Sequence, residues 1–122
     1  MRSTAKAFAI NAHGTVGIQY SPDGFQIPEL ALWSRSAGTQ LSGILSDPCG
    51  VTDSDDILSP GDVAGPFLWN PDYRSANVTD LIEPGSPDVS QLYLCTFASN
   101  GVLAGQAFFE GVFEAVVLTP AR

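Results

Sequence analysis

The densest group of side chains that could do chemistry is the acidic segment Asp53-Ser54-Asp55-Asp56. Carboxylate oxygens are the ligands that the hard cation Ca²⁺ prefers. The spacing differs from an EF-hand, because the glycine and the distant glutamate of that motif are not in place. Asp53, Asp55 and Asp56 therefore predict either a loose calcium site, completed by backbone carbonyls or a neighbouring subunit, or a solvated acidic loop, which is the commoner case.

Two aromatic residues, Trp69 and Tyr73, lie in a Pro-rich part of the chain. Exposed aromatic rings in loops serve as stacking platforms for sugars or as anchors in protein interfaces. Rings in such loops also pack down onto the core, and this is the more frequent role. We therefore consider Trp69 and Tyr73 as candidate interface or ligand-binding residues, with loop packing as the alternative.

The remaining candidates for catalysis are a single histidine and two cysteines. His13 stands beside Gly14 in an expected turn, where no nucleophile or orienting acid can be identified around it, so we expect an exposed turn residue. Without a recognisable secretion signal, Cys49 and Cys95 are expected to be free thiols rather than a disulfide. We accordingly expect a protein that is not an enzyme; a small enzyme built on buried carboxylates is the remaining catalytic alternative.

Apolar side chains recur with a period of two along much of the chain, which is typical of β-strands. We therefore expect strands to position these residues. Residues 7–20 read as a hairpin, and 30–34 and 41–45 as two further strands. Residues 91–98 form a strand whose two faces both look buried. Glycines and β-branched residues favour strands over a helix across 102–118.

The composition changes between residues 46 and 90. This stretch holds six of the nine prolines and nine of the thirteen carboxylates. Such a density of breakers predicts two long irregular loops at one end of the domain, with short ordered pieces only around 67–69 and 78–82. Long loops in a compact domain are usually functional or packed against a partner.

The whole chain has 122 residues, which predicts a single β domain over residues 1–122. Its net charge of −8 excludes a phosphate-binding surface, so no direct nucleic-acid partner is expected. No apolar run approaches the length of about 20 residues that a membrane-spanning helix needs, so no membrane partner is expected either. The expected architecture is all-β, an antiparallel sandwich or jelly roll of about eight strands with long Pro- and Asp-rich loops.

One segment also carries a family resemblance. Residues 111–120, preceded by the strand 92–97, resemble the closing strands of the jelly-roll coat proteins of small icosahedral viruses, which end with a glycine, an aromatic-acidic strand and a proline. The likeness covers residues 92–120. The chain departs from that family in being shorter and in lacking a basic arm, since Met1 to Lys6 holds only two positive charges.

The composition is similar to that of small coat, accessory and decoration proteins of viruses and phages. This resemblance implies a virion structural protein, a coat or capsid-decoration subunit located in the virion, that binds copies of itself or other capsid proteins. It would do so by burying its loops and the surfaces of its terminal strands. Calcium bound by aspartates between subunits is common in coat proteins, which fits the segment 53–56. The alternative is a carbohydrate- or ligand-binding β-sandwich module that uses Trp69 and Tyr73.

Overall fold

The computed structural model describes residues 4–21, 28–60, 65–72, 74–82, 90–98 and 100–120. Within these ranges, eleven strands form three antiparallel sheets, and one short 3₁₀ helix follows the eighth strand. The predicted all-β antiparallel fold is thus confirmed.

The first sheet, here called the N-terminal sheet, has the order β1-β2-β3-β4. Its strands are β1 (Thr4–Ile10), β2 (Val16–Ser21), β3 (Glu29–Ser34) and β4 (Gly38–Leu45). The hairpin of β1 and β2 turns at residues 11–15, where Gly14 takes a φ of 84° that favours glycine. This sheet contains the hairpin and the two strands predicted for residues 7–45.

Four short strands form the middle sheet, and three longer strands form the C-terminal sheet. The middle sheet has the order β5-β6-β7-β8, and the C-terminal sheet has the order β11-β10-β9. The middle strands are β5 (Gly50–Val51), β6 (Ile57–Ser59), β7 (Phe67–Asn70) and β8 (Arg74–Asn77), followed by the 3₁₀ helix η1 (Val78–Leu81). The C-terminal strands are β9 (Ser90–Phe97), β10 (Leu103–Phe109) and β11 (Val112–Leu118).

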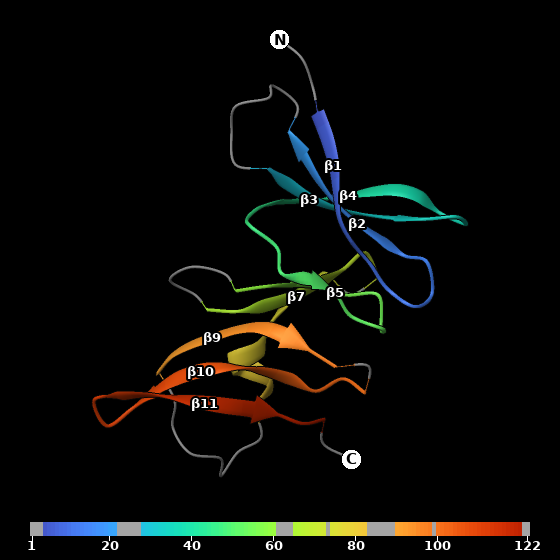
Figure 1. Cartoon of the computed structure of the whole chain (residues 1–122). Helices are drawn as coiled ribbons and strands as arrows, with labels where there is room; N and C mark the ends of the chain where they lie inside the picture. Colours follow the sequence, from blue (N-terminus) through green and yellow to red (C-terminus); the bar gives the residue numbers. More distant parts are fainter. Residues whose placement is uncertain are drawn as a thin grey trace.

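The three sheets stack as layers, with the middle sheet between the other two (Figure 1). Each sheet contains only consecutive strands in chain order, so the chain runs through three successive meanders. In a jelly roll, by contrast, strands alternate between two facing sheets. Of the two architectures that the sequence left open, the described strands therefore form a sandwich, and this sandwich has three layers.

The prediction of long irregular loops over residues 46–90 is wrong at β5, β6 and β8, whereas the short ordered pieces expected around residues 67–69 and 78–82 are confirmed as β7 and η1. The four strands of this stretch form the middle layer. The prolines stand at the ends of its strands, with Pro48 before β5, Pro60 after β6, Pro66 before β7 and Pro71 after it. Strands of two to four residues fit between such breakers, and their length gives no periodic pattern to recognise.

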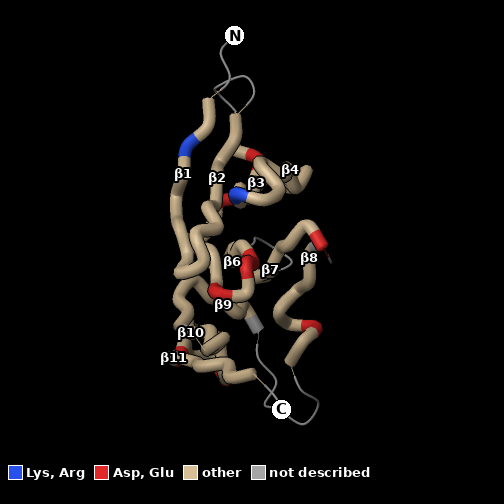
Figure 2. The backbone as a smooth tube through the Cα atoms, turned by 90° about the vertical axis from the view of Figure 1, so that its right-hand side faces the viewer, with Lys and Arg blue, Asp and Glu red and all other residues tan. Residues whose placement is uncertain are grey.

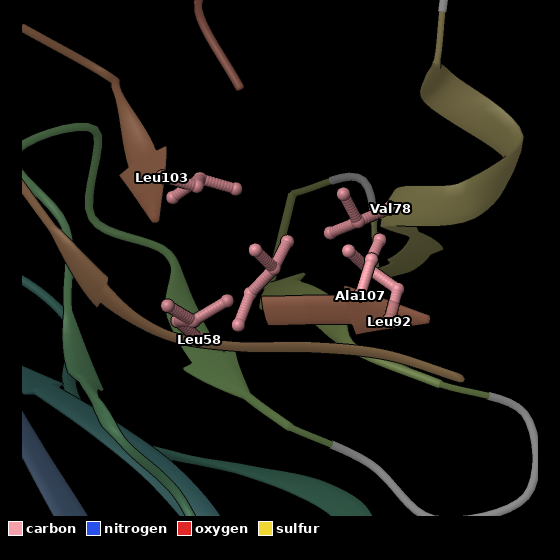
Figure 3. Close-up of a cluster of buried hydrophobic side chains, with 6 residues drawn as sticks. Leu58, Val78, Leu92, Leu103 and Ala107 are labelled. Atoms are coloured by element: carbon pink, nitrogen blue, oxygen red, sulfur yellow. The ribbon is translucent and has the colours of Figure 1, made fainter. Parts of the chain in front are cut away.

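Two cores lie on the two faces of the middle sheet. Ile57 and Trp69 point toward the N-terminal sheet and pack with Leu30 and Leu32. The next residue of β6 points the other way, because side chains alternate along a strand. The second core, between the middle and C-terminal sheets, comprises Leu58, Val78, Leu92, Leu94, Leu103 and Ala107, of which Figure 3 labels five.

Candidate interaction surfaces

The acidic segment forms the turn between β5 and β6. Asp56 is buried, Asp53 is half-buried, and Asp55 has a left-handed backbone with a φ of 65°. Within the described residues, no three His, Cys, Asp or Glu side chains gather in a way that could hold a metal ion. Calcium binding by Asp53, Asp55 and Asp56 stays a prediction from the sequence.

The Asp55 carboxylate instead accepts a hydrogen bond from Asn11 Nδ2 at 2.6 Å. The same amide nitrogen donates to the Thr52 carbonyl oxygen at 2.8 Å, while Asn11 Oδ1 accepts the backbone N–H groups of His13 and Thr15. One side chain thus closes the β1–β2 turn and attaches it to the β5–β6 turn. His13 Nδ1 lies 3.8 Å from Asp55 Oδ1 in an exposed position, where an ion pair contributes little.

Asn70 extends this network to a third turn. Its Nδ2 donates to the Asp55 carbonyl oxygen at 3.1 Å, and its Oδ1 accepts the N–H of Asp72 at 2.7 Å. The turns that follow β1, β5 and β7 are therefore joined by two asparagine side chains. The acidic segment serves this junction between the N-terminal and middle sheets.

The two aromatic candidates have different outcomes. Trp69 is only 4% exposed and packs in the core between the N-terminal and middle sheets. Its proposed role as an exposed stacking or interface residue is therefore corrected, because β7 directs its side chain inward. Tyr73 lies outside the described residues.

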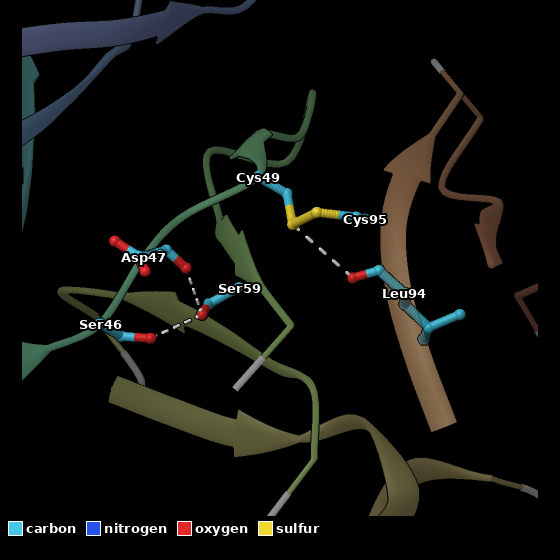
Figure 4. The surroundings of a disulfide bond; sticks show 6 residues. All are labelled: Ser46, Asp47, Cys49, Ser59, Leu94 and Cys95. Carbon is cyan, nitrogen blue, oxygen red and sulfur yellow. Dashed lines mark hydrogen bonds between the residues drawn. A yellow bond between two sulfur atoms is a disulfide. The ribbon is translucent and has the colours of Figure 1, made fainter. Parts of the chain in front are cut away.

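The two cysteines form a disulfide, which corrects the prediction of free thiols. Cys49 stands just before β5 and Cys95 on β9, with their Cα atoms 5.2 Å apart, so the bond joins the middle sheet to the C-terminal sheet (Figure 4). The segment before Cys49 is held by Ser59, whose hydroxyl donates to the Asp47 carbonyl oxygen at 2.8 Å. The Cys49 N–H donates to the Leu58 carbonyl oxygen at 2.7 Å.

A bulge in β9 explains why Cys95 reaches the middle sheet. Leu94 pairs with Gly105 and Thr96 pairs with Ala104, which leaves Cys95 as an extra residue in the register. Gly105 is required there, since a Cβ atom would collide with the Tyr93 carbonyl oxygen. The bulge lets both Leu94 and Cys95 face inward. Tyr93 lies on the opposite side of β9 from Leu92 and Leu94 and is about half exposed, so β9 is not buried on both faces as predicted.

The N-terminal sheet turns one face away from the rest of the molecule, and this face is almost entirely apolar. Leu30 and Leu32 point into the core, so their neighbours Ala31 and Trp33 lie on the outer face. Ile10, Leu41 and Leu45 on this face are each more than half exposed. The register places the following residues on the N-terminal outer face: Ala5, Ala7, Ile10, Val16, Ile18, Tyr20, Glu29, Ala31, Trp33, Thr39, Leu41 and Leu45.

The C-terminal sheet has a comparable outer face at the opposite end of the stack (Figure 1). Phe108 and Phe113 meet edge to face there, with ring centroids 5.1 Å apart. The register places the following residues on the C-terminal outer face: Tyr93, Thr96, Ala104, Gln106, Phe108, Phe113, Ala115 and Val117. An open groove of about 390 Å³ crosses this face and is lined by Tyr93, Gln106 and Phe113 among others.

Most of the described acidic side chains lie around the middle sheet rather than on these two outer faces. By register, the N-terminal outer face includes one charged residue, Glu29, whose carboxylate accepts the Gly43 N–H at 2.7 Å. Glu114 of β11 lines the groove of the C-terminal outer face. The described carboxylates of residues 46–82 lie in and around the middle sheet, at positions 47, 53, 55, 56, 72 and 80 (Figure 2). A protein docking on either outer face would therefore cover apolar side chains and little charge.

Sequence reasoning missed Ile10, Trp33, Leu41 and Leu45 as candidate binding residues. The available signal was the run Leu30-Ala31-Leu32-Trp33, which is apolar on both faces of its strand. In a sheet with one solvated face, such a strand would alternate between apolar and polar residues.

Searches of protein-family models, of curated proteins and of solved structures found no match for this chain. No helix within the described ranges is long and apolar enough to cross a membrane.

Proposed function

We propose that this chain is a virion structural protein, a small coat or capsid-decoration subunit that binds copies of itself or other capsid proteins. The observation that carries the proposal is the pair of apolar outer faces at opposite ends of the stack. Antiparallel sheets that face water normally alternate apolar and polar residues, and extended apolar patches mark interaction sites. Two such faces allow one subunit to contact two neighbours, as a shell requires.

The disulfide also supports this role. Disulfides persist outside the reducing cytosol, on secreted proteins and on virion surfaces. The bond between the middle and C-terminal sheets stabilises the stack against the loss of one layer. A particle that leaves its host cell needs subunits that stay folded in such surroundings.

The N-terminal outer face can be tested with one substitution and a control on the same strand. Leu41→Asp introduces a charge on this face, at its edge strand β4, whereas Gln40→Asp introduces the same charge on the other side of β4, at an exposed position. We expect the unmodified chain and Gln40→Asp to form species larger than a dimer at high concentration in light scattering and negative-stain images. Leu41→Asp should lose these species while remaining folded; equal behaviour of all three proteins would contradict the proposal.

The groove on the C-terminal outer face favours a second function, a carbohydrate- or ligand-binding module. Tyr93 and Phe113 border this groove and the Gln106 amide lines it, an arrangement that suits a flat hydroxylated ligand. Binding of a glycan array by the unmodified chain and its loss in Tyr93→Ala would support this alternative. Glycan binding that is unchanged in Tyr93→Ala would exclude this groove as the binding site.

A further inference from the structure

Among the strands that the structure describes, β11 is an open edge of the C-terminal sheet, and it has neither the register shift nor the short length that marks each of the other edges. Proteins guard edge strands with bulges, short lengths, prolines or charged side chains. β11 has seven residues, contains no proline, carries one charge at Glu114, and pairs with β10 without a register shift. The other edge strands are irregular or short: β1, β4 and β9 take part in register shifts, β5 has two residues and β8 has four.

The β10–β11 turn fixes which backbone groups of β11 are free. The turn consists of Glu110 and Gly111, whose φ values of 46° and 88° fit a type I′ hairpin. In such a hairpin the flanking residues Phe109 and Val112 exchange hydrogen bonds, and every second residue of β11 after Val112 then bonds to β10. The N–H and C=O groups at the open edge accordingly belong to Phe113, Ala115 and Val117.

We propose that two copies of this chain associate by antiparallel pairing of their β11 strands, around a two-fold axis at Ala115. This deepens the proposed function, on which it rests, by naming one contact between subunits. In this register Ala115 pairs with Ala115 of the partner subunit, and Phe113 pairs with Val117 of the partner subunit. The hydrogen-bonding phase matches, because each of these pairs uses the groups that point away from β10. The two C-terminal sheets become one sheet with a continuous apolar outer face.

Charge and side-chain size also fit this pairing. Glu114, the one charged residue of β11, lies opposite Val116 of the partner subunit rather than opposite its own copy. Like charges directly across a strand pair destabilise it, whereas pairs of an aromatic and a β-branched residue, such as Phe113 with Val117, stabilise it. Phe113 and Val117 are each at least half exposed in the single chain, so pairing removes apolar surface from water.

The contact is small. A seven-residue strand spans about 24 Å, and two such edges bury less than the roughly 1,200 Å² at which stable interfaces begin. The dimer is therefore reversible and forms with increasing concentration. In a larger assembly, further contacts on the outer faces add to it.

A pair of cysteine variants tests the register directly. Two Ala115 Cα atoms facing each other in a hydrogen-bonded pair are about 5.5 Å apart, which is within the range for a disulfide. Two Val112 residues lie about six positions apart in the same register, or about 20 Å. Both positions are exposed, so Val112→Cys is a matched control for Ala115→Cys. Under mild oxidation we expect covalent dimer from Ala115→Cys to form at least about tenfold faster; equal rates would overturn the proposal.

Amide hydrogen exchange on the unmodified chain tests the same contact without a substitution. The amides of Phe113, Ala115 and Val117 should gain protection as the protein concentration rises, while that of Glu114 should be protected throughout. Protection that does not change with concentration would overturn the pairing.

These results separate the pairing from the proposed function. If the chain formed species larger than a dimer but Ala115→Cys did not cross-link, the β11 pairing would be wrong and the proposed function as a shell subunit would still hold. Cross-linked dimers that never grow further would support the pairing and contradict the shell subunit.

Discussion

Asn11 is the single side chain on which the junction between the N-terminal and middle sheets most depends. All four of its hydrogen-bonding contacts are used, two by the oxygen within its own turn and two by the nitrogen toward Thr52 and Asp55. Asparagine suits this position because its amide is both donor and acceptor. Alanine would remove the acceptor of the N–H of buried Thr15 and both bonds from the β1–β2 turn to the β5–β6 turn, where the Thr52 carbonyl oxygen would keep the Asp55 N–H.

We therefore expect Asn11→Ala to lower the free energy of unfolding by about 1–3 kcal/mol. Asn100→Ala is a suitable control, since Asn100 accepts one long hydrogen bond, 3.4 Å from the Val102 nitrogen, in an exposed turn. Its effect should stay within about 0.5 kcal/mol. Urea unfolding followed by fluorescence measures both, and equal losses in the two variants would refute the role given to Asn11.

At the scale of elements, the bulge in β9 has the largest consequence. By adding Cys95 to the register it directs this residue toward Cys49, and it thereby joins two sheets that are otherwise held by apolar packing. The bond closes a segment with a sequence separation of 46 residues. Cross-linking a segment of this length lowers the entropy of the unfolded chain by an amount worth about 4 kcal/mol in the chain-entropy model.

Reduction of the disulfide should accordingly lower the free energy of unfolding by up to about 4 kcal/mol. Urea unfolding with and without dithiothreitol measures this loss. The double variant Cys49→Ser with Cys95→Ser is the control, because it should unfold at the same urea concentration under both conditions. If the urea midpoint of the unmodified chain were the same with and without dithiothreitol, the disulfide would add no stability.

Elements also differ in how well the sequence predicts them. The N-terminal and C-terminal sheets follow from period two, because their strands are six to eight residues long. The middle sheet cannot be predicted in this way, because a strand of two residues, such as Gly50–Val51, is too short to show a period. The disulfide escaped prediction because the bulge at Cys95 arises from pairing between strands, which one strand's sequence does not reveal. Trp69 was considered as an exposed residue because an ordered piece as short as residues 67–69 does not reveal which of its side chains face a core.

At the scale of the whole molecule, the chain is a stack whose middle carries most of the described acidic side chains and whose two ends are apolar. The sequence shows both an acidic stretch and strands without polar alternation. It does not show that the acidic residues and the apolar faces lie in different layers of the stack. That separation lets copies approach end to end while the acidic middle layers stay in solvent. With a net charge of −8, copies still repel one another over the Debye length, which is about 10 Å at 0.1 M salt and shorter above it.

The most direct test of assembly through apolar ends is the mass of the unmodified chain in solution, measured by size exclusion with light scattering. It should be measured at several protein concentrations, each at about 0.05 M and about 0.5 M sodium chloride. We expect a mass above the 12.8 kDa of one chain, rising with protein concentration and with salt, since salt screens the repulsion and leaves the apolar contacts in place. A mass of one chain at every concentration and both salt levels would contradict the account.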